Sequence, residues 1–394
     1  MNWKSVVIIM LSVCSCIPSD SLTTSYTESD SLGIRIVSNN LAGDNDLPTI
    51  RLDAEPVVDV GLVEGPEELR FFRVTDAKLV ENDELLVVNA GTQEVRIFNR
   101  AGAYLRSFGR EGEGPGEFRV PTRAFVWGSD SVAVWDYRLR RMSVFTLDGA
   151  FVRHVRPELQ AVNPDIVGVF DDGSFLVTDH RMEIPTSGFA DADLTFVRYS
   201  PNGSFLDSAD VYSAGRYGRL DDPGGMVGSP VFSAGAVTTA SSERYWVGAR
   251  LTYEIAAYEP SGRLVQLVRW SGPDRTISSA DVEAFWEDRK RGASDESRRR
   301  LERMSQGTPV AQQFPSHGRV FHAHGGIIWV QMYRRPTDTG ANKYWVFDSE
   351  GRLVARAETP ETLRVTSIGS DCVVGIELDG LDVEHVRVYH LSER

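Results

Sequence analysis

Four arginines recur at one point of a repeated pattern and are suited to binding an anionic group. Three of them follow the central valine of a short apolar run by four residues, and the fourth follows such a valine by three; they are Arg138, Arg181, Arg334 and Arg250. A guanidinium binds a carboxylate or phosphate through two parallel hydrogen bonds. We therefore expect these side chains to form a partial ring that holds an anionic ligand. The alternative is local pairing with acids such as Asp136 and Asp179, which stand two residues before Arg138 and Arg181.

Two histidines, His322 and His324, have the spacing of neighbours on one face of a strand. Zinc sites use histidine but need three or four protein ligands, and no further ligand is evident for this pair. Calcium sites need several oxygen ligands, and the many acids of the chain show no pattern that selects a set. The sequence also has no Gly-x-Ser-x-Gly elbow. It thus identifies no catalytic residue and no metal ligand, and we expect no cofactor.

The segment GREGEGPGEF, residues 109–118, is too rich in glycine for the interior of a helix or strand. A phosphate-binding loop would continue into Lys-Ser or Lys-Thr, and this segment does not. We expect it to connect two repeated units, with its glycines turning the backbone. Ligand contact is the alternative.

The elements that carry these residues repeat along the chain. Apolar runs recur six times, centred on Val88, Val134, Val177, Val247, Val330 and Val374. Each run is followed by an aromatic residue, and in five cases a glycine comes four residues later: Phe98/Gly102, Phe145/Gly149, Tyr199/Gly203, Tyr258/Gly262 and Phe347/Gly351, with Tyr389 as the sixth aromatic. Apolar residues alternate before each aromatic, which indicates a half-buried strand that enters a tight turn.

Both signals resemble the NHL repeat, and SVAVWDYRLRRMSVFTLDGAFVRHV, residues 131–155, is the best copy. More closely, the chain resembles the six-bladed β-propeller lipoproteins of bacteria, from about Asp53 to its end. The resemblance implies an all-β fold, a six-bladed β-propeller of four-stranded antiparallel blades. It also implies a structural role for Arg141, which matches an arginine of the NHL pattern.

The last repeated unit stops at its third strand, in HVRVYHL, so its fourth strand must come from elsewhere. EPVVDVGLVEGPEEL, residues 55–69, is similar to LRSFGREGEGPGEF, the fourth strand and crossing of the first unit. We expect this N-terminal strand to complete the sixth blade and close the ring, which leaves no unpaired edge.

All long connections fall on one face of such a propeller: residues 179–193, 213–229, 331–341 and 278–315. Because loops carry function on rigid scaffolds, we expect the ligand site on this loop-rich face. The longest connection, between blades 4 and 5, is predicted to contain two helices capped by Ser278 or Ser279 and by Ser294, with Gly292 between them. Their apolar stripe is thin, so they should lie on the propeller. They either form a flap over the channel mouth or shield blades 4 and 5.

The N-terminus has the pattern of an exported lipoprotein. Residues 1–15 contain the apolar run VVIIMLSV after Lys4, which is typical of a cleaved signal peptide and too short to span a bilayer. VCSC then resembles a bacterial lipobox, which implies lipidation of Cys16; secretion without lipid is the alternative. Residues 16–52 are expected to form a polar tether and lead-in. Ile17, in place of aspartate, favours the outer membrane over retention in the inner membrane.

Cys372 has no disulfide partner in the mature chain and is predicted to be a small buried hydrophobe. Asp and Glu total 56 against 42 Lys and Arg, a net charge of −14. So acidic a surface argues against nucleic acid as a partner.

Together these features predict a binding module anchored in the cell envelope, which holds a peptide, glycan or protein partner at the loop-rich face. The lipid anchor is its only expected contact with the membrane. Two alternatives stay open: a metal-dependent hydrolase or lyase with its site at the central channel, and a scaffold in an envelope protein complex. An exposed apolar patch formed by Phe285 and Trp286 would favour the scaffold.

Overall fold

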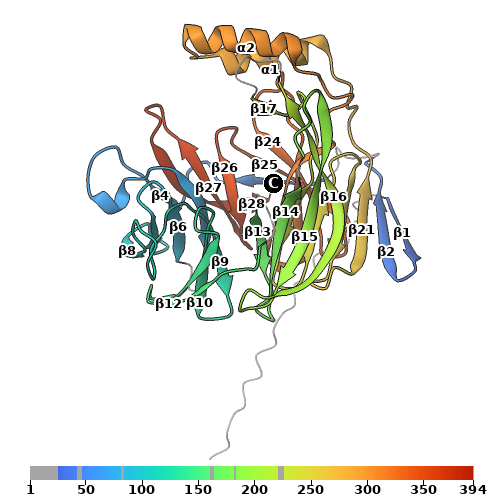
Figure 1. Cartoon of the computed structure of the whole chain (residues 1–394). Coiled ribbons are helices and arrows are strands. Elements are labelled where there is room, and N and C mark those ends of the chain that lie inside the picture. Colours follow the sequence, from blue (N-terminus) through green and yellow to red (C-terminus); the bar gives the residue numbers. More distant parts are fainter. Residues whose placement is uncertain are drawn as a thin grey trace, which may run out of the picture.

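The fold is built almost entirely from β-strands (Figure 1). The computed structural model describes residues 25–41, 47–80, 84–159, 164–181, 183–220 and 226–393. Cys16 and the predicted signal peptide lie outside these ranges. Among the described residues, no helix is long and apolar enough to cross a bilayer.

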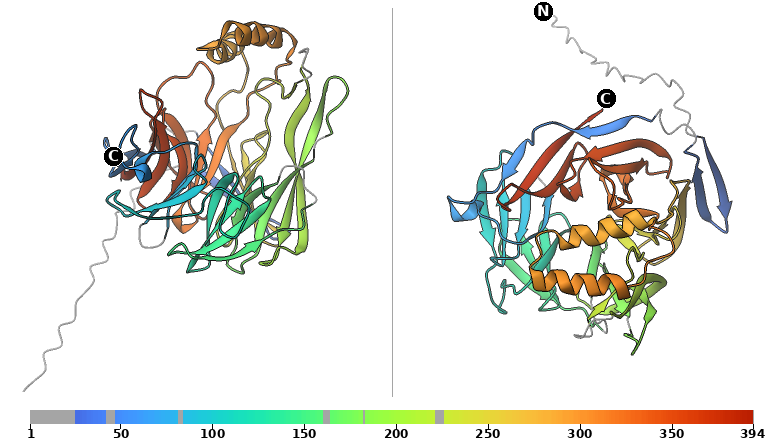
Figure 2. Two further views of the ribbon diagram at one scale, coloured as in Figure 1. Left: turned by 60° about the vertical axis from the view of Figure 1, so that its left-hand side comes forward. Right: turned by 90° about the horizontal axis from the view of Figure 1, so that it is seen from above.

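Six antiparallel units of neighbouring strands follow one another along the chain and surround a central axis, as the view from above shows (Figure 2). Blade 1 contains β5 (Val74–Leu79), β6 (Leu85–Asn89), β7 (Glu94–Phe98) and β8 (Tyr104–Phe108). Blade 2 contains β9 (Pro121–Trp127), β10 (Ser131–Asp136), β11 (Arg141–Thr146) and β12 (Phe151–Val155). Blade 3 contains β13 (Asp165–Val169), β14 (Phe175–Arg181), β15 (Phe189–Tyr199) and β16 (Phe205–Arg219).

The second half of the ring repeats this order. Blade 4 contains β18 (Val237–Ala240), β19 (Tyr245–Gly248), β20 (Glu254–Tyr258) and β21 (Leu264–Trp270). Blade 5 contains β22 (His317–His322), β23 (Ile328–Met332), β24 (Asn342–Phe347) and β25 (Leu353–Thr359). Blade 6 contains β26 (Arg364–Ile368), β27 (Cys372–Leu378) and β28 (Glu384–Glu393).

The repeated sequence signals correspond to the second and third strands of these blades. The apolar runs form strands that are buried on both faces, as in β6 and β19, because the neighbouring blades pack against both sides of each sheet. The glycine after each aromatic adopts the positive φ that the turn requires, for example +78° at Gly102 and +90° at Gly149. Local periodicity therefore encodes the middle of each blade.

The hydrophobic core is divided among the gaps between adjacent blades. Between blades 6 and 1, for example, Val374 and Val386 pack with Val87 and Phe98. Val60 of β4 (Val58–Val60), the N-terminal strand, belongs to the same cluster, and β4 pairs antiparallel with β28.

The prediction of uniformly four-stranded blades is too simple. Blade 3 gains β17 (Val227–Gly228), and blade 4 gains β2 (Ile34–Asn39) and β1 (Tyr26–Ser31) at its outer edge. The strand β3 (Thr49–Leu52) pairs with both β25 and β28 and so joins blades 5 and 6 in one sheet. These additions cover outer strands that would otherwise present unpaired backbone groups.

Part of the expected tether is thus structured. Every residue of β1 is exposed, so no hydrophobic pattern marks it as a strand. It is held by backbone pairing with β2 and by ion pairs from Glu28 to Arg35 and Arg352, each at 3.0 Å. Backbone pairing and surface charge leave no periodic signal in a sequence, which explains the difference.

The long connections on the loop-rich face differ from the prediction in blade 3. Strands β14, β15 and β16 extend into residues 179–193 and 213–219, and β16 alone spans 15 residues. In Figure 1 the hairpin formed by β15 and β16 rises from the ring toward the helices. Two short 3-10 turns, η2 (Glu67–Leu69) and η4 (His324–Gly326), lie elsewhere in the connections.

The helical insertion has the predicted elements. Helix α1 (Ser279–Lys290) begins after Ser278, which forms a capping box with Asp281, and α2 (Asp295–Gly307) begins after Ser294. Gly292 between them has a φ of +70°. Both helices lie across one side of the face of the ring (Figure 2).

A small apolar cluster joins the helices to the propeller. Trp286 of α1 is buried there against Phe232 and Phe314, which precede blades 4 and 5, while Phe285 is half-buried in the same cluster. The exposed patch that would favour a scaffold is therefore not formed by these two residues, because they anchor α1 to the ring.

Candidate functional site: the central channel and its mouth

A channel runs through the centre of the ring, with a cavity volume of about 1230 Å³. Its lining includes residues of β5, β9, β13, β18, β22 and β26, the innermost strand of every blade. Pockets for small ligands usually measure about 300–1,000 Å³, so the channel has room for a ligand.

The channel wall carries charges of both signs, and its aspartates are Asp76, Asp165, Asp171 and Asp371. Four innermost strands each place one cation in it: Lys78 on β5, Arg123 on β9, Arg319 on β22 and Arg364 on β26. On β13 and β18 small residues meet instead, because a Cβ built at Gly168 would lie only 2.6 Å from the Cβ of Ala240. The cations of the channel wall thus come from blades 1, 2, 5 and 6, and the aspartates of the lining equal them in number.

Each of these cations also bonds to the next blade. The donors and the carbonyl oxygens that accept are Lys78 Nζ to Ala124 at 2.5 Å, Arg123 Nη1 to Ile166 at 3.1 Å, Arg319 Nη1 to Val365 at 2.9 Å and Arg364 Nη2 to Val74 at 2.7 Å. These bonds tie blade 5 to blade 6 and continue through blades 1 and 2 to blade 3. They therefore fix the position of the charged groups.

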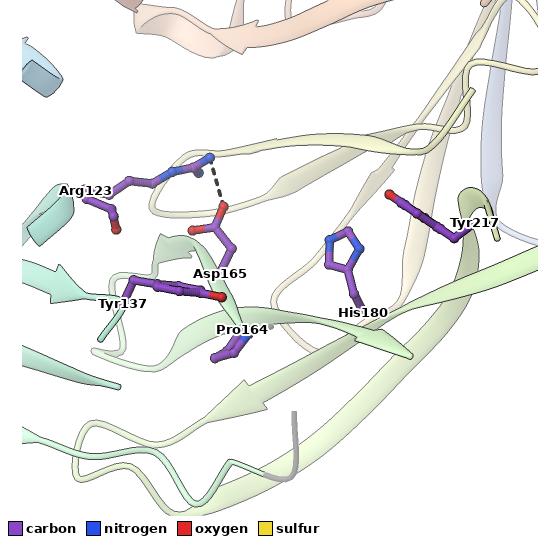
Figure 3. Close-up of a pocket in the computed structure, with 7 residues that line it drawn as sticks. Arg123, Tyr137, Pro164, Asp165, His180 and Tyr217 are labelled. Atoms are coloured by element: carbon purple, nitrogen blue, oxygen red, sulfur yellow. Dashed lines mark ion pairs between the residues drawn. The ribbon is translucent and has the colours of Figure 1, made fainter. Parts of the chain in front are cut away.

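A smaller hollow, which we call the mouth pocket, adjoins the channel and has a volume of about 450 Å³. It is lined by Thr122, Arg123, Tyr137, Pro164, Asp165, His180 and Tyr217 (Figure 3). Arg123, Asp165 and His180 also line the channel, so the two hollows are continuous. Tyr137 lies in the connection between β10 and β11, which places the mouth pocket on the loop-rich face.

Polar and aromatic groups face one another across the mouth pocket (Figure 3). Arg123 Nη2 and Asp165 Oδ2 form an ion pair at 3.0 Å on one side, near the ring of Tyr137. His180 and Tyr217 lie together on the other side. Burial lowers the pKa of His180, against the opposing influence of Asp165 and Asp179, and so favours the neutral imidazole. A neutral imidazole can donate one hydrogen bond and accept another.

The three predicted arginines whose side chains are described do not line this mouth. Within the described residues, Arg138, Arg250 and Arg334 lie outside the linings of both cavities. The side chain of Arg181 lies outside the described part of the chain, although its backbone belongs to β14. Arg138 is exposed and directly follows Tyr137 of the mouth pocket.

Arg250 and Arg334 hold the loops in which they lie. Arg250 has a φ of +64°, and its guanidinium donates to the carbonyls of His317 at 2.9 Å and Gly235 at 3.5 Å. Arg334 donates to the carbonyls of Gly340 and Asp338 and forms an ion pair with Glu361 at 2.5 Å. Pairing of these arginines with nearby acids, the alternative to an anion site, thus occurs at Arg334, whose partner is Glu361.

The candidate metal ligands do not converge. In the described ranges, no three His, Cys, Asp or Glu side chains are grouped as a metal site would require. His322 stacks on Trp246 at 5.3 Å, and burial lowers its pKa to about 4. Cys372 is buried and unpaired, as predicted, and burial raises the pKa of its thiol to about 11.

The segment GREGEGPGEF connects β8 to β9, as predicted, and a buried arginine organises it. The guanidinium of Arg141 donates to the carbonyls of Glu113 and Gly114 at 2.8 Å and of Glu117 at 3.0 Å. Arg96 does the same for the crossing before blade 1, where it donates to the carbonyls of Glu67, Glu68 and Arg70. The similarity between these two crossings in sequence therefore extends to how they are held.

Sequence reasoning missed the residues that line the channel. A signal for them exists, since Lys78, Arg123, Arg319 and Arg364 stand ten or eleven residues before the central valine of their units. In blades 3 and 4 the same places hold apolar residues, such as Ile166 and Val237. Tyr137, His180 and Tyr217 give no comparable signal, because they come from different parts of different blades.

Comparison of the sequence with known families agrees with this architecture. Residues 63–167 match the family DUF5128, which is described as a 6-bladed beta-propeller. The chain is a six-bladed β-propeller. No curated protein has a sequence that matches the chain significantly.

Several solved structures have a similar course of the chain. A Bacteroides fragilis protein assigned as exported is 13% identical, with a TM-score of 0.49 over 86% of this chain and 95% of its own. A virginiamycin B lyase of Staphylococcus aureus is 10% identical, with a TM-score of 0.42 over 92% and 99%. A gluconolactonase of Xanthomonas campestris is 13% identical, with a TM-score of 0.40 over 86% and 97%. Likenesses this distant carry no argument about activity.

Proposed function

We propose that this propeller is a binding module of the cell envelope, whose ligand enters the mouth pocket from the loop-rich face. The observation that carries the proposal is the continuous hollow from the mouth pocket into a channel lined by all six blades. A concave site with aromatic walls and a few placed polar groups is the usual form of a ligand pocket.

The lining indicates the kind of ligand. Tyr137 and Tyr217 offer flat apolar rings, while the Arg123–Asp165 pair and His180 offer donors and acceptors in fixed positions. This combination suits a ring with polar substituents, as found in a glycan or in an aromatic residue of a peptide. Arg138, exposed beside Tyr137, would contact the ligand at the rim, whereas Arg250 and Arg334 would maintain the loops.

An array of defined oligosaccharides and short peptides tests the proposal. The double variant Tyr137→Ala/Tyr217→Ala should lose the signals that the wild-type protein gives, because both aromatic walls are removed. Tyr104→Ala is the matched control, since Tyr104 is an exposed tyrosine on the outer strand β8. Wild-type signals that persist in the double variant would contradict a site in the mouth pocket.

We infer that this module is tethered through lipid on Cys16 and belongs to the outer membrane. The support is the sequence alone: an apolar leader, the VCSC pattern and Ile17 after the cysteine. We also infer NHL-type blades with a ring closed by β4, for which the pairing of β4 with β28 is the support.

A further inference from the structure

Two guanidiniums of the channel wall have no carboxylate partner. Arg319 and Arg364 lie on β22 and β26, the innermost strands of adjacent blades, and both line the channel. In the described part of the chain, no acidic side chain lies within ion-pair distance of either one. Lys78 and Arg123 differ in this respect, because Asp76 and Asp165 each lie at 3.0 Å from their charged groups.

Both guanidiniums are held in place by groups that leave most of their donors unused. Arg319 donates one bond to the carbonyl of Val365 at 2.9 Å and lies 4.7 Å from the ring centre of Phe321. Arg364 donates one bond to the carbonyl of Val74 at 2.7 Å. A guanidinium has five N–H donors. Each side chain is thus positioned in advance and can still bind an oxyanion through two donors.

Arg319 lies close enough to Arg123 and Arg364 for their charges to affect it. Arg319 is accessible to solvent in the cavity, yet protein surrounds it, and this burial lowers its pKa. The nearby charges of Arg123 and Arg364 lower it further, and Asp76 opposes them only in part. Four aspartates also line the channel, but Asp76 and Asp165 pair with Lys78 and Arg123. Arg319 and Arg364 are therefore the cations of the wall that stay available to an anion.

We propose that Arg319 and Arg364 form an oxyanion subsite in the channel, which binds a carboxylate or phosphate group. An oxyanion there would accept two or more charge-assisted hydrogen bonds and relieve the repulsion among the three arginines. The oxyanion group and the ring bound in the mouth pocket would be parts of one ligand if the proposed function holds. The existence of the subsite does not depend on the proposed function.

Isothermal titration of the purified protein with inorganic phosphate and, separately, with citrate tests the subsite at low ionic strength. Arg319→Met and Arg364→Met should each weaken binding of the preferred anion about tenfold or more, since a charged donor pair is lost. Arg263→Met is the matched control, because it removes the same charge from an exposed turn where Arg263 pairs with Glu259. Arg364→Lys keeps the charge, so it should bind the anion more tightly than Arg364→Met does. It also keeps the proposal testable if Arg364→Met fails to fold.

The outcomes separate the possibilities. A loss in both methionine variants but not in Arg263→Met supports the subsite, and the stronger of the two anions identifies phosphate or carboxylate as the group. No binding of either anion by the wild-type protein, or equal binding by all variants, overturns it. The titration uses phosphate and citrate, whereas the mouth pocket is tested with oligosaccharides and peptides, so failure of the mouth pocket and failure of the subsite can be told apart.

Discussion

Single buried side chains fix the connections of this ring. Arg141 is 1% exposed, and it supplies hydrogen bonds to three carbonyls of the glycine-rich crossing between blades 1 and 2. Glu117 holds the same segment from within, because its carboxylate accepts from the backbone N–H of Gly114 at 2.7 Å and pairs with Arg110. The backbone hydrogen bond, followed by Arg110, lowers the pKa of Glu117.

Replacing Arg141 should therefore destabilise the protein. We expect Arg141→Met to lower the free energy of unfolding by about 1–3 kcal/mol, since the methionine keeps the bulk but leaves buried carbonyls unpaired. Urea unfolding measures the change. Arg138→Met, at an exposed position three residues earlier, should unfold at the wild-type midpoint. Equal midpoints for both variants would show that the crossing does not depend on Arg141.

His317 makes stability depend on pH. Its side chain is 0% exposed, and burial lowers its pKa to about 4 from a usual 6.5. Between these values the unfolded chain takes up a proton that the folded protein excludes, so stability is full above pH 6.5 and falls as the pH drops.

From pH 7 to pH 5, this histidine should account for a loss of about 2 kcal/mol in the free energy of unfolding. Gln cannot take up the proton, so His317→Gln should lose correspondingly less over the same range, whatever its stability at pH 7. Urea unfolding at both pH values provides the comparison. Parallel pH profiles for wild type and variant would rule out His317 as the source.

At the level of elements, the short strand β4 depends on close backbone packing. It pairs with β28, and Gly61 directly follows it. A Cβ at Gly61 would lie 2.5 Å from the carbonyl oxygen of Glu384 and 2.9 Å from the Cα of His385. The approach of the two segments thus requires glycine.

Gly61→Ala should push β4 away from blade 6 and cost about 1–3 kcal/mol, the usual range for overpacking. Gly380→Ala is the control, because nothing lies within 4 Å of a Cβ at that turn. Urea unfolding and limited proteolysis of residues 53–70 report the effect. If both variants behave alike, the pairing of β4 contributes little to the ring.

At the scale of the whole molecule, the expected lipid would place the propeller at a membrane that none of its described helices could cross. Cys16→Ser should move the protein from the membrane fraction to the soluble fraction, since the lipid chains supply the attachment. Cys14→Ser and Cys372→Ser should both leave it in the membrane fraction. Separation of cell fractions, with a lipid label to detect acylation, distinguishes these variants; a membrane-bound Cys16→Ser protein would contradict the anchor.

The sequence by itself determined the features that depend on neighbours along the chain. Local periodicity and local hydrogen bonding account for the two middle strands of each blade, for turn glycines such as Gly149, and for the helix caps Ser278 and Ser294.

Only the tertiary structure decided the channel wall, because Arg319 and Arg364 come close to Arg123 only when the blades close into a ring. The exposed strand β1 also becomes evident only in the tertiary structure. It is held by backbone pairing with β2, and many polar sequences permit such pairing. Contacts between distant segments leave no periodic pattern, and this is why the site was less predictable than the fold.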